Sequence, residues 1–487
     1  MDPADKVAAD GPEKEMLRGP GLLESMSTQR HSLGFYTAIC CTARFSLASR
    51  TDNALNMPSI PTLSLVYTAL HEVIAQHPPL SVSIEDEASP SARFVRLSSI
   101  NLERLVHVQD LPAGADEVTR QRLLNELIES RLSSRFSDLG VLPLWRLVVF
   151  LPDSRDADTS AGVDIALFVH HGIADGGSAV MFMQTLLTAL NTASTRQPEE
   201  PLGAVVSPPK STFLRPVEEL HALPISFISL LYAIWRMWFP ASRVGLWTGE
   251  PISRPSNVLS NVVQTRHAIR VFSVETVTNL LAVCRAHKAT ITPLLEALVA
   301  RALFASLPTD GSANLLKASC PINLRAFLPE QKNAMGVYVA SGEHDFKRGD
   351  ADVWREAKRA GSSLARVLGD MKKGKHFNVG MLRYVGDMRE YLEGKVGKPR
   401  DHSFEVSNTG AVDGSGGEQG PWRMSQLLFS QSGNITGAAV AFSVSSVRGG
   451  PMTISASWVE GVVDESVVDA TFDKLVSLVE GVCSEKL

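Results

Sequence analysis

The stretch VDIALFVHHGIADGGSAVMFMQTLL, Val163 to Leu187, places two adjacent histidines between two regular elements. Residues 163–169 form a continuous apolar run, typical of a central strand buried on both faces. Residues 178–191 have the apolar periodicity of a helix. Between them lie His170 and His171, then the sequence Asp-Gly-Gly at 175–177. This order predicts a buried strand, a tight turn and a helix, with the histidines where the strand ends.

The residue types in this turn are suited to proton transfer. Neighbouring strand residues point to opposite sides, so one histidine can enter a cavity while the other packs in the core. An imidazole with its ordinary pKa of about 6.5 is largely neutral and basic near neutral pH. Removing a proton from a bound hydroxyl or amine is typically worth about 10² to 10⁴ in rate. Gly172 lets the backbone leave the strand, and Asp175 can reach back to the turn or to a cation. The whole pattern favours this interpretation over two histidines that only pack at a strand end.

The rest of the chain predicts a second domain. A length of 487 residues exceeds one ordinary core. Strand-like and helix-like segments alternate on both sides of a Pro-rich stretch, residues 195–216. We expect a disordered tail over 1–20, an N-terminal αβ domain over 21–195, a linker and apolar crossover segment over 196–261, and a C-terminal αβ domain over 262–487.

Composition excludes several classes of function. The formal net charge is −5 and no Lys/Arg-rich block occurs, so we expect no nucleic-acid partner. The five cysteines are scattered and odd in number, which favours free thiols in a reducing compartment. The first residues lack an apolar core, so they do not resemble a secretory signal. We expect a monomer in the cytoplasm, or on the surface of the ER or of lipid droplets.

Several catalytic and metal-binding motifs fail on inspection. In HEVIAQH, His71 to His77, a zinc helix needs histidine at position 75, which is Ala75. The run GSGGEQG, 414–420, departs from the dinucleotide-binding pattern and is better interpreted as a hairpin loop. There is no G-x-S-x-G elbow and no P-loop. We therefore expect no metal and no permanently bound cofactor.

The segment from Leu223 to Trp247 is very apolar and aromatic, with Arg236 inside it and Pro240 as a stop. Its uninterrupted part is shorter than the ~20 residues of a spanning helix. We expect a buried helix or one that covers a cavity. Contact with a membrane surface and a true span are the alternatives, in that order.

Four stretches together resemble a known family. HHGIADG matches the HHxxxDG signature of the CoA-dependent acyltransferases, which include chloramphenicol acetyltransferase, plant BAHD enzymes and peptide-synthetase condensation domains. QRHSLGFYTAICCTARF (29–45), PINLRAFLPEQKNAMGVYVA (321–340) and the closing strands around EVSNTG (405–410) and FSQSGNITGAAVAFSV (429–444) are similar to fungal alcohol acetyltransferases. The plant DFGWG motif is absent, and Gly336-Val337 stands where many relatives have Gly-Asn, so no role of that Asn is transferred.

The resemblance implies an α/β fold of two chloramphenicol-acetyltransferase-like domains with an active-site tunnel between them. It implies that His171 is the catalytic base, His170 its structural neighbour, and Asp175, beside Gly176, the partner of Arg325 from the other domain. It also makes candidates for oxyanion or acceptor contacts of Tyr36, Ser407, Asn408, Thr409, Ser430, Gln431 and Ser432. For each of these seven, a role in strand ends or in the core is an equal or stronger alternative.

The implied activity is transfer of an acetyl or other short acyl group from acyl-CoA, a co-substrate, to the hydroxyl of a lipophilic alcohol. His171 would take the hydroxyl proton, and no covalent acyl-enzyme would form. Two alternatives stay open: a donor carried on the phosphopantetheine arm of a carrier protein, or a member of the fold that no longer acylates. An open donor tunnel fringed with positive charge would favour free CoA.

Overall fold

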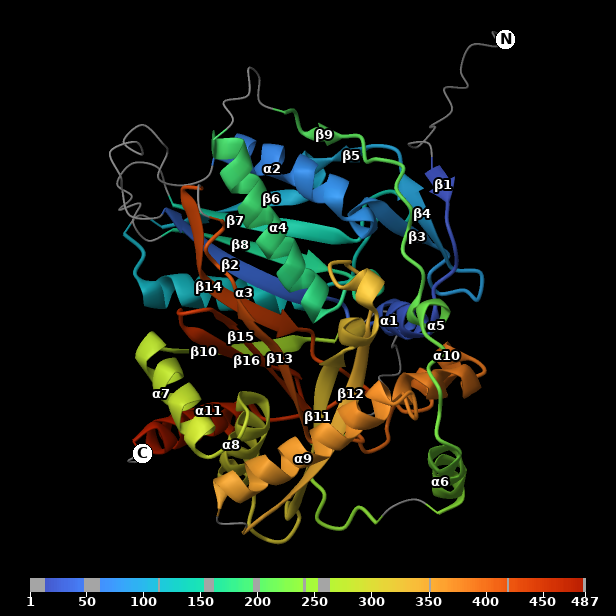
Figure 1. Cartoon of the computed structure of the whole chain (residues 1–487), viewed down its shortest axis with the longest axis vertical. Coiled ribbons are helices and arrows are strands. Elements are labelled where there is room, and N and C mark those ends of the chain that lie inside the picture. The colour runs from blue at the N-terminus through green and yellow to red at the C-terminus, as the bar shows by residue number, and fades with distance from the viewer. Residues whose placement is uncertain are drawn as a thin grey trace.

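The computed structural model describes residues 14–47, 62–112, 114–152, 162–195, 202–239, 242–252, 263–349, 352–417 and 420–484. Two large mixed sheets lie one above the other in Figure 1, each covered by helices. Residues 1–13 of the predicted tail (1–20) lie outside the described residues. Within the rest of that range, β1 (Lys14–Met16) pairs with β4 (Arg93–Leu97), a contact that the prediction of a disordered tail did not include.

The first sheet holds the strand that ends at the two histidines. Its five strands run in the order β14 (Trp422–Gln431), β2 (Ile39–Leu47), β8 (Val163–Val169), β7 (Trp145–Pro152) and β6 (Val106–Leu111). Every residue of β8 is buried, as the apolar run predicts. Helices α2 (Leu63–Gln76) and α4 (Gly176–Thr195) cover one face, and α3 (Glu117–Leu132) lies on the other (Figure 1). The predicted strand, turn and helix around the histidines are therefore confirmed.

The second sheet belongs to the C-terminal half. Its six strands are β10 (Thr265–Phe272), β16 (Met452–Val459), β15 (Val440–Val447), β13 (Phe404–Val412), β11 (Leu315–Asn323) and β12 (Val339–Lys347), in that order. Four helices pack on it: α7 (Val274–Ala286), α8 (Ile291–Ser306), α9 (Val353–Lys372) and α11 (Glu465–Cys483). Two small sheets, β1-β4-β3 (β3, Val82–Glu85) and β5-β9 (Ile100–Asn101, Val205–Val206), edge the N-terminal half.

A strand of the C-terminal half completes the first sheet, which the sequence did not predict. β14 comes from the C-terminal half, yet it pairs antiparallel with β2 at the edge of the first sheet, from Trp422↔Leu47 to Gln431↔Ile39. Helix α1 (Leu22–Ser32) also joins the halves, since Leu23 packs in one cluster with Leu324 and Phe377 of the second half. Because each half completes the other, residues from distant parts of the chain are held in fixed positions where they meet.

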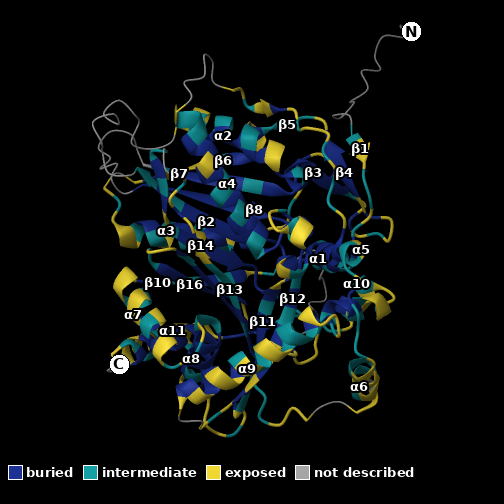
Figure 2. Ribbon diagram, in the orientation of Figure 1, coloured by how far each residue is buried: buried dark blue, intermediate teal, exposed yellow. Residues whose placement is uncertain are grey.

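The apolar segment after the linker does not have the predicted burial. Helix α6 (Phe227–Trp238) stands apart from the body in Figure 1, at the end of a strap that includes α5 (Val217–Leu220). Figure 2 colours it exposed and intermediate, and Phe227, Ile228 and Trp238 are 70%, 78% and 78% exposed. The expectation of a buried helix is wrong, because most of its apolar side chains are exposed in the described structure.

No single helix among the described residues is both long and apolar enough to cross a membrane. Helices α7 and α8 reach that length and hydropathy only as a pair bent by 104°.

Candidate active site

A cavity of about 360 Å³ lies where the two halves meet, and His171 forms part of its wall. The wall also takes residues from α1 and β2 of the first half and from β11, β12, β13 and β14 of the second. The lining combines apolar and polar side chains in about equal measure, and its apolar part includes Leu23, Met26, Ile39, Val339, Leu382 and Phe429. The cavity therefore suits a molecule with an apolar part that also meets several polar groups.

His171 is placed in this cavity by the turn after β8. Its Nδ1 atom is buried and has no hydrogen-bond partner among the described residues. Burial lowers the pKa of His171 to about 4, although its own main-chain carbonyl and Asp175 act in the opposite direction. The ring of Tyr36 lies 5.5 Å away, centroid to centroid. His171 is thus neutral at pH 7 and able to accept a proton.

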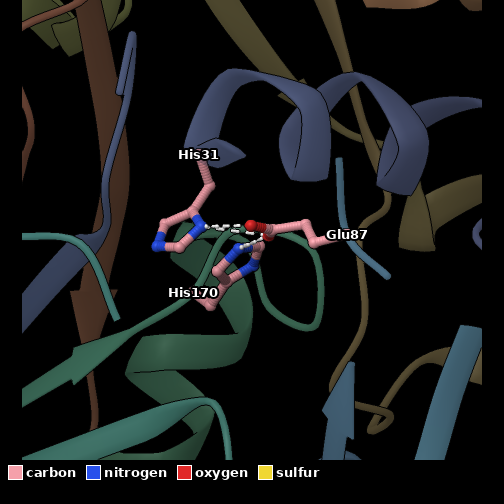
Figure 3. Close-up of side chains that lie close together, drawn as sticks. All are labelled: His31, Glu87 and His170. Atoms are coloured by element: carbon pink, nitrogen blue, oxygen red, sulfur yellow. Dashed lines mark hydrogen bonds and ion pairs between the residues drawn. The ribbon is translucent and has the colours of Figure 1, made fainter. Parts of the chain in front are cut away.

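His170 points the other way, into the core, as expected for the neighbour of a cavity residue. Its Nε2 lies 2.8 Å from Oε1 of Glu87, and Glu87 also lies 2.8 Å from Nδ1 of His31, at the end of α1 (Figure 3). All three side chains are buried. Burial would raise the pKa of Glu87, but the hydrogen bonds from His170 and His31 outweigh it and lower the pKa to about 2. Glu87 is therefore a buried carboxylate held by two imidazoles.

Three such residues so close together also resemble a metal site. The main-chain N–H of Phe136 donates to Nε2 of His31, and that of Gly172 donates to Nδ1 of His170. Each of these nitrogens uses its lone pair, so the other ring nitrogen carries the proton and donates to Glu87. Neither protonated nitrogen has a lone pair for a metal. The cluster is a closed hydrogen-bond network that fixes both tautomers.

Asp175 makes the predicted ion pair with the second half of the chain. Its Oδ2 lies 2.9 Å from Nη1 of Arg325 and accepts the main-chain N–H of Tyr338. Its Oδ1 accepts both the N–H and the hydroxyl of Ser178. Burial would raise the pKa of Asp175, but the charge and hydrogen bond of Arg325 hold it below its ordinary value. The turn that carries His171 is therefore tied to η5 (Leu324–Phe327) by a buried charge pair.

Two glycines of the motif are required by close approach. A Cβ at Gly172 would lie 2.9 Å from Nδ1 of His170, and one at Gly176 would lie 3.0 Å from the ring of Phe429. Gly176 also lines the cavity beside His171.

Of the seven residues expected to contact substrate, the structure brings Tyr36, Ser407 and Gln431 to the cavity. Ser430, the neighbour of Gln431 in β14, and Ser432, the residue just after that strand, point to the opposite face. There Ser430 contacts His267, and Ser432 bonds to the backbone of Ala38.

Asn408 follows Ser407 and points away in the same manner, donating to Thr292. Thr409 lies where the pairing of β13 with β15 shifts register, and it donates to the carbonyl of Val444. Four of the seven residues therefore do not line the cavity and instead bond to other parts of the protein: Asn408, Thr409, Ser430 and Ser432.

The polar wall of the cavity is a hydrogen-bonded chain. The hydroxyl of Tyr36 donates to Oε1 of Gln431, whose Nε2 donates to Oε1 of Glu405 at 2.9 Å. The hydroxyl of Ser319 donates to the other oxygen of Glu405. Arg30 lies in the same wall.

Sequence reasoning did not single out Glu87, His31, Arg30 or Glu405. His31 and Arg30 stand inside the quoted stretch 29–45, and Glu405 begins EVSNTG, so the resemblance gave their region but not their role. Glu87 lies in a loop with no distinguishing pattern, and only the folded chain brings it to the histidines.

We expect Asp175→Asn and Arg325→Met each to destabilise the protein by about 3–5 kcal/mol, because each leaves a buried charge without its partner. The double substitution should cost less than the sum of the two. Denaturant unfolding of all four proteins measures this. Strictly additive losses would contradict the pairing.

Glu87→Gln should destabilise the protein at pH 7, because the amide removes the negative charge that both imidazole N–H groups contact and turns an NH₂ donor toward one of them. The folded pKa of about 2 lies below the ordinary 4.5, so the carboxylate stabilises the fold above about pH 4.5 and this contribution is lost as pH falls toward 2. The difference in unfolding free energy between wild type and Glu87→Gln should therefore narrow between pH 5 and pH 3, as measured by urea unfolding. The exposed Glu103→Gln is the matched control, and a difference in unfolding free energy that does not depend on pH would refute the assignment.

Comparisons with known proteins agree with this geometry. The sequence profile of the alcohol acetyltransferase family matches residues 20–483. A probable alcohol acetyltransferase, FCK4, of Fusarium pseudograminearum is 27% identical over 98% of this chain and 97% of its own. Another, crmB of Aspergillus fumigatus, is 28% identical over 91% and 95%.

Solved structures show the shared fold. The TRI3 trichothecene 15-O-acetyltransferase from Fusarium sporotrichioides has a TM-score of 0.67 at 14% identity and covers 96% of this chain and 95% of its own. The epimerization domain of tyrocidine synthetase B has a TM-score of 0.59 at 14% identity, covering 98% and 99%. The predicted two-lobed, chloramphenicol-acetyltransferase-like α/β fold is confirmed. Because the profile spans almost the whole chain, including both histidines and Arg325, this protein belongs to the alcohol acetyltransferase family.

Proposed function

We propose that the protein transfers an acetyl group from acetyl-CoA directly to the hydroxyl of an apolar alcohol, with His171 as the general base. The carrying observation is a neutral, half-buried imidazole that lines the cavity between the two halves and has a ring nitrogen without a partner in the described structure. His171 removes the hydroxyl proton as the oxygen attacks the thioester carbonyl carbon. The carbon–sulfur bond breaks, and the proton passes to the CoA thiolate.

Two features of the cavity support direct transfer. None of the five cysteines, all of which lie in described parts of the chain, belongs to its lining. The hydroxyl of Ser407 lines the cavity, whereas the Gln431 amide is engaged by Tyr36, Glu405 and Ser443. We therefore assign Ser407, of the two strand residues, to the oxyanion of the tetrahedral intermediate.

A basic hollow supports free CoA as the donor. This hollow, about 350 Å³, shares Lys395, Asp401 and Thr436 with the cavity, and Arg243, Lys398 and Arg400 also line it. Four cations therefore face one carboxylate. Among these groups, the Arg400 side chain gives the strongest support for a bound phosphate. The residue is 4% exposed, and its Nε and Nη2 atoms are buried without a partner in the described structure. A buried guanidinium with free donors suits phosphate oxygens, as in the nucleotide end of CoA.

Helix α6 supports contact with a membrane surface. Its eight largest exposed side chains are all apolar: Phe227, Ile228, Leu231, Tyr232, Ile234, Trp235, Trp238 and the adjoining Phe239. Between residues 223 and 247 the charged residues are Arg236 and Arg243, both positive, in a chain of net charge −5. Aromatic side chains with flanking cations are typical of helices that lie in the headgroup region.

The strap before α6 is fixed to the cavity wall. The carbonyl of Leu223 accepts from Arg383, and that of Pro224 accepts from Phe377. This contact is with η7 (Asn378–Tyr384), whose Asn378, Val379 and Leu382 line the cavity. A lipid-bound α6 would hold the acceptor side of a monomeric enzyme near the membrane from which an apolar alcohol arrives.

His171→Ala should fold normally and lose about 10² to 10⁴ in kcat, because the proton acceptor is gone. Wild-type kcat/KM should stay level above about pH 5 and fall only as pH approaches 4, where the ring becomes protonated. His170→Ala is the matched control and should mainly lower the melting temperature. Near-wild-type turnover of His171→Ala with acetyl-CoA and an alcohol acceptor would contradict the assignment of His171 as the general base.

Arg400→Met should raise the KM for acetyl-CoA about tenfold or more, as expected for a lost charged hydrogen bond to phosphate. It should leave the KM for S-acetylpantetheine, which lacks the nucleotide, unchanged. Steady-state kinetics with both donors measures this, with the exposed Lys332→Met as control. Equal effects on the two donors would point to a carrier-bound donor or to misfolding.

Wild-type protein should float with anionic liposomes, and Trp235→Ser/Trp238→Ser/Phe239→Ser should not, because the apolar face of α6 is lost. Val118→Ser, which removes an equally exposed apolar side chain on α3, should float like wild type. If the wild type stays in the dense fraction at every anionic lipid content, α6 does not bind membranes.

A further inference from the structure

The guanidinium of Arg30 makes no hydrogen bond or ion pair with described residues in the cavity that it lines. It lies in the last turn of α1, where its carbonyl accepts the N–H groups of Phe35 and Tyr36 and so fixes the following turn. Its side chain lines the cavity with His171. Nε is buried without a partner, and the guanidinium makes no hydrogen bond or ion pair to the described residues.

Arg30 as a residue is half-buried, but its Nε is shielded from solvent without an acceptor among the described residues. Arginine stays protonated in proteins and offers five N–H donors in a planar fork. Leaving the buried donor unpaired costs its desolvation. No described side chain meets these donors, so an oxygen of a molecule bound in the cavity would supply the missing acceptor.

Glu405 contributes the opposite charge to the same cavity without pairing with Arg30. Its two oxygens accept from Gln431 at 2.9 Å and from Ser319 at 3.2 Å. Arg30 and Glu405 influence each other electrostatically but are not within ion-pair distance. Asp175, Asp401 and Lys395 also line the cavity, so its carboxylates outnumber its cations by three to two. Arg30 nonetheless lacks an oxygen ligand from the described residues. This balance favours a neutral oxygen acceptor over a further carboxylate.

Resting on the function proposed above, we infer that Arg30 binds a carbonyl oxygen of the acceptor, so that the preferred acceptor is an apolar alcohol that also carries a ketone or ester group. The aliphatic lining formed by Leu23, Met26 and Ile39 then takes the hydrocarbon part. Arg30 is a specificity-determining residue in this assignment, and His171 performs the proton transfer.

The test compares the binding of three probes by calorimetry, with CoA present at saturation. Each probe is a cyclohexanol with one para substituent: a sec-butyl group, a methyl ester of the same shape, or a carboxylate. Wild type should bind the ester about tenfold or more tightly than the sec-butyl probe. The carboxylate should bind no more tightly than the ester.

Arg30→Met should abolish this preference and leave the affinity for the sec-butyl probe unchanged, while Arg30→Lys should retain part of it. Arg93→Met, which removes an exposed arginine outside the cavity, is the matched control. Equal affinity of wild type for all probes, no binding of the ester, or a loss in Arg30→Met that is equal for all probes would each overturn the inference. Much tighter binding of the carboxylate probe than of the ester would overturn the inference that the group bound by Arg30 is a neutral carbonyl.

Turnover is measured separately with the same probes and acetyl-CoA. His171→Ala should bind the ester as wild type does but not acetylate it. If wild type binds the ester selectively and acetylates nothing, the proposed function fails while the assignment of Arg30 stands.

Discussion

The buried carboxylate of Asp175 is the contact on which the rest of the site depends. It receives four hydrogen bonds, two from Ser178 at the start of α4 and two from Arg325 and Tyr338 of the other half. Replacing a buried ion pair by apolar groups is often neutral for stability, whereas a half-broken pair is costly. Its main effect here is therefore positional: it fixes the turn of His171 against the sheet that carries Ser407 and Glu405.

A second carboxylate holds the same turn from the opposite side. Glu87 accepts hydrogen bonds from His170 and His31, while Asp175 forms an ion pair with Arg325. Both carboxylates have lowered pKa values because donors outweigh burial, but burial prevails for His171 and lowers its pKa too. The result is two fixed negative charges with a neutral base between them. One fold can separate structural from catalytic ionisable groups by giving neighbouring groups environments that shift their pKa values differently.

The local part of this arrangement was predictable from the sequence, and the non-local part was not. Strand β8, its turn and α4 follow from residue periodicity, and one histidine in a cavity with the other in the core follows from strand alternation. The pairing of Asp175 with Arg325 came from the family resemblance. The exchange of β14, the contact of Glu87 with His170 and the exposure of α6 depend on long-range packing, which leaves no spacing signal. Strand alternation also explains why Ser407 and Gln431 reach the cavity and their neighbours do not.

Buried polar atoms without partners border the space where substrates would bind. Nδ1 of His171, Nε of Arg30 and Oδ1 of Asn378 line or adjoin the cavity, and Nε and Nη2 of Arg400 adjoin the basic hollow. In a folded protein, each such atom costs free energy that packing elsewhere must offset. A fold in which both Asp175 and Glu87 are fully bonded nonetheless leaves these atoms unmet. Ligand oxygens would satisfy the arginine donors, and a ligand hydroxyl would satisfy the acceptor Oδ1 of Asn378. Because this cost is relieved only on binding, the same atoms that lower the stability of the empty enzyme raise its discrimination between molecules with and without a matching oxygen.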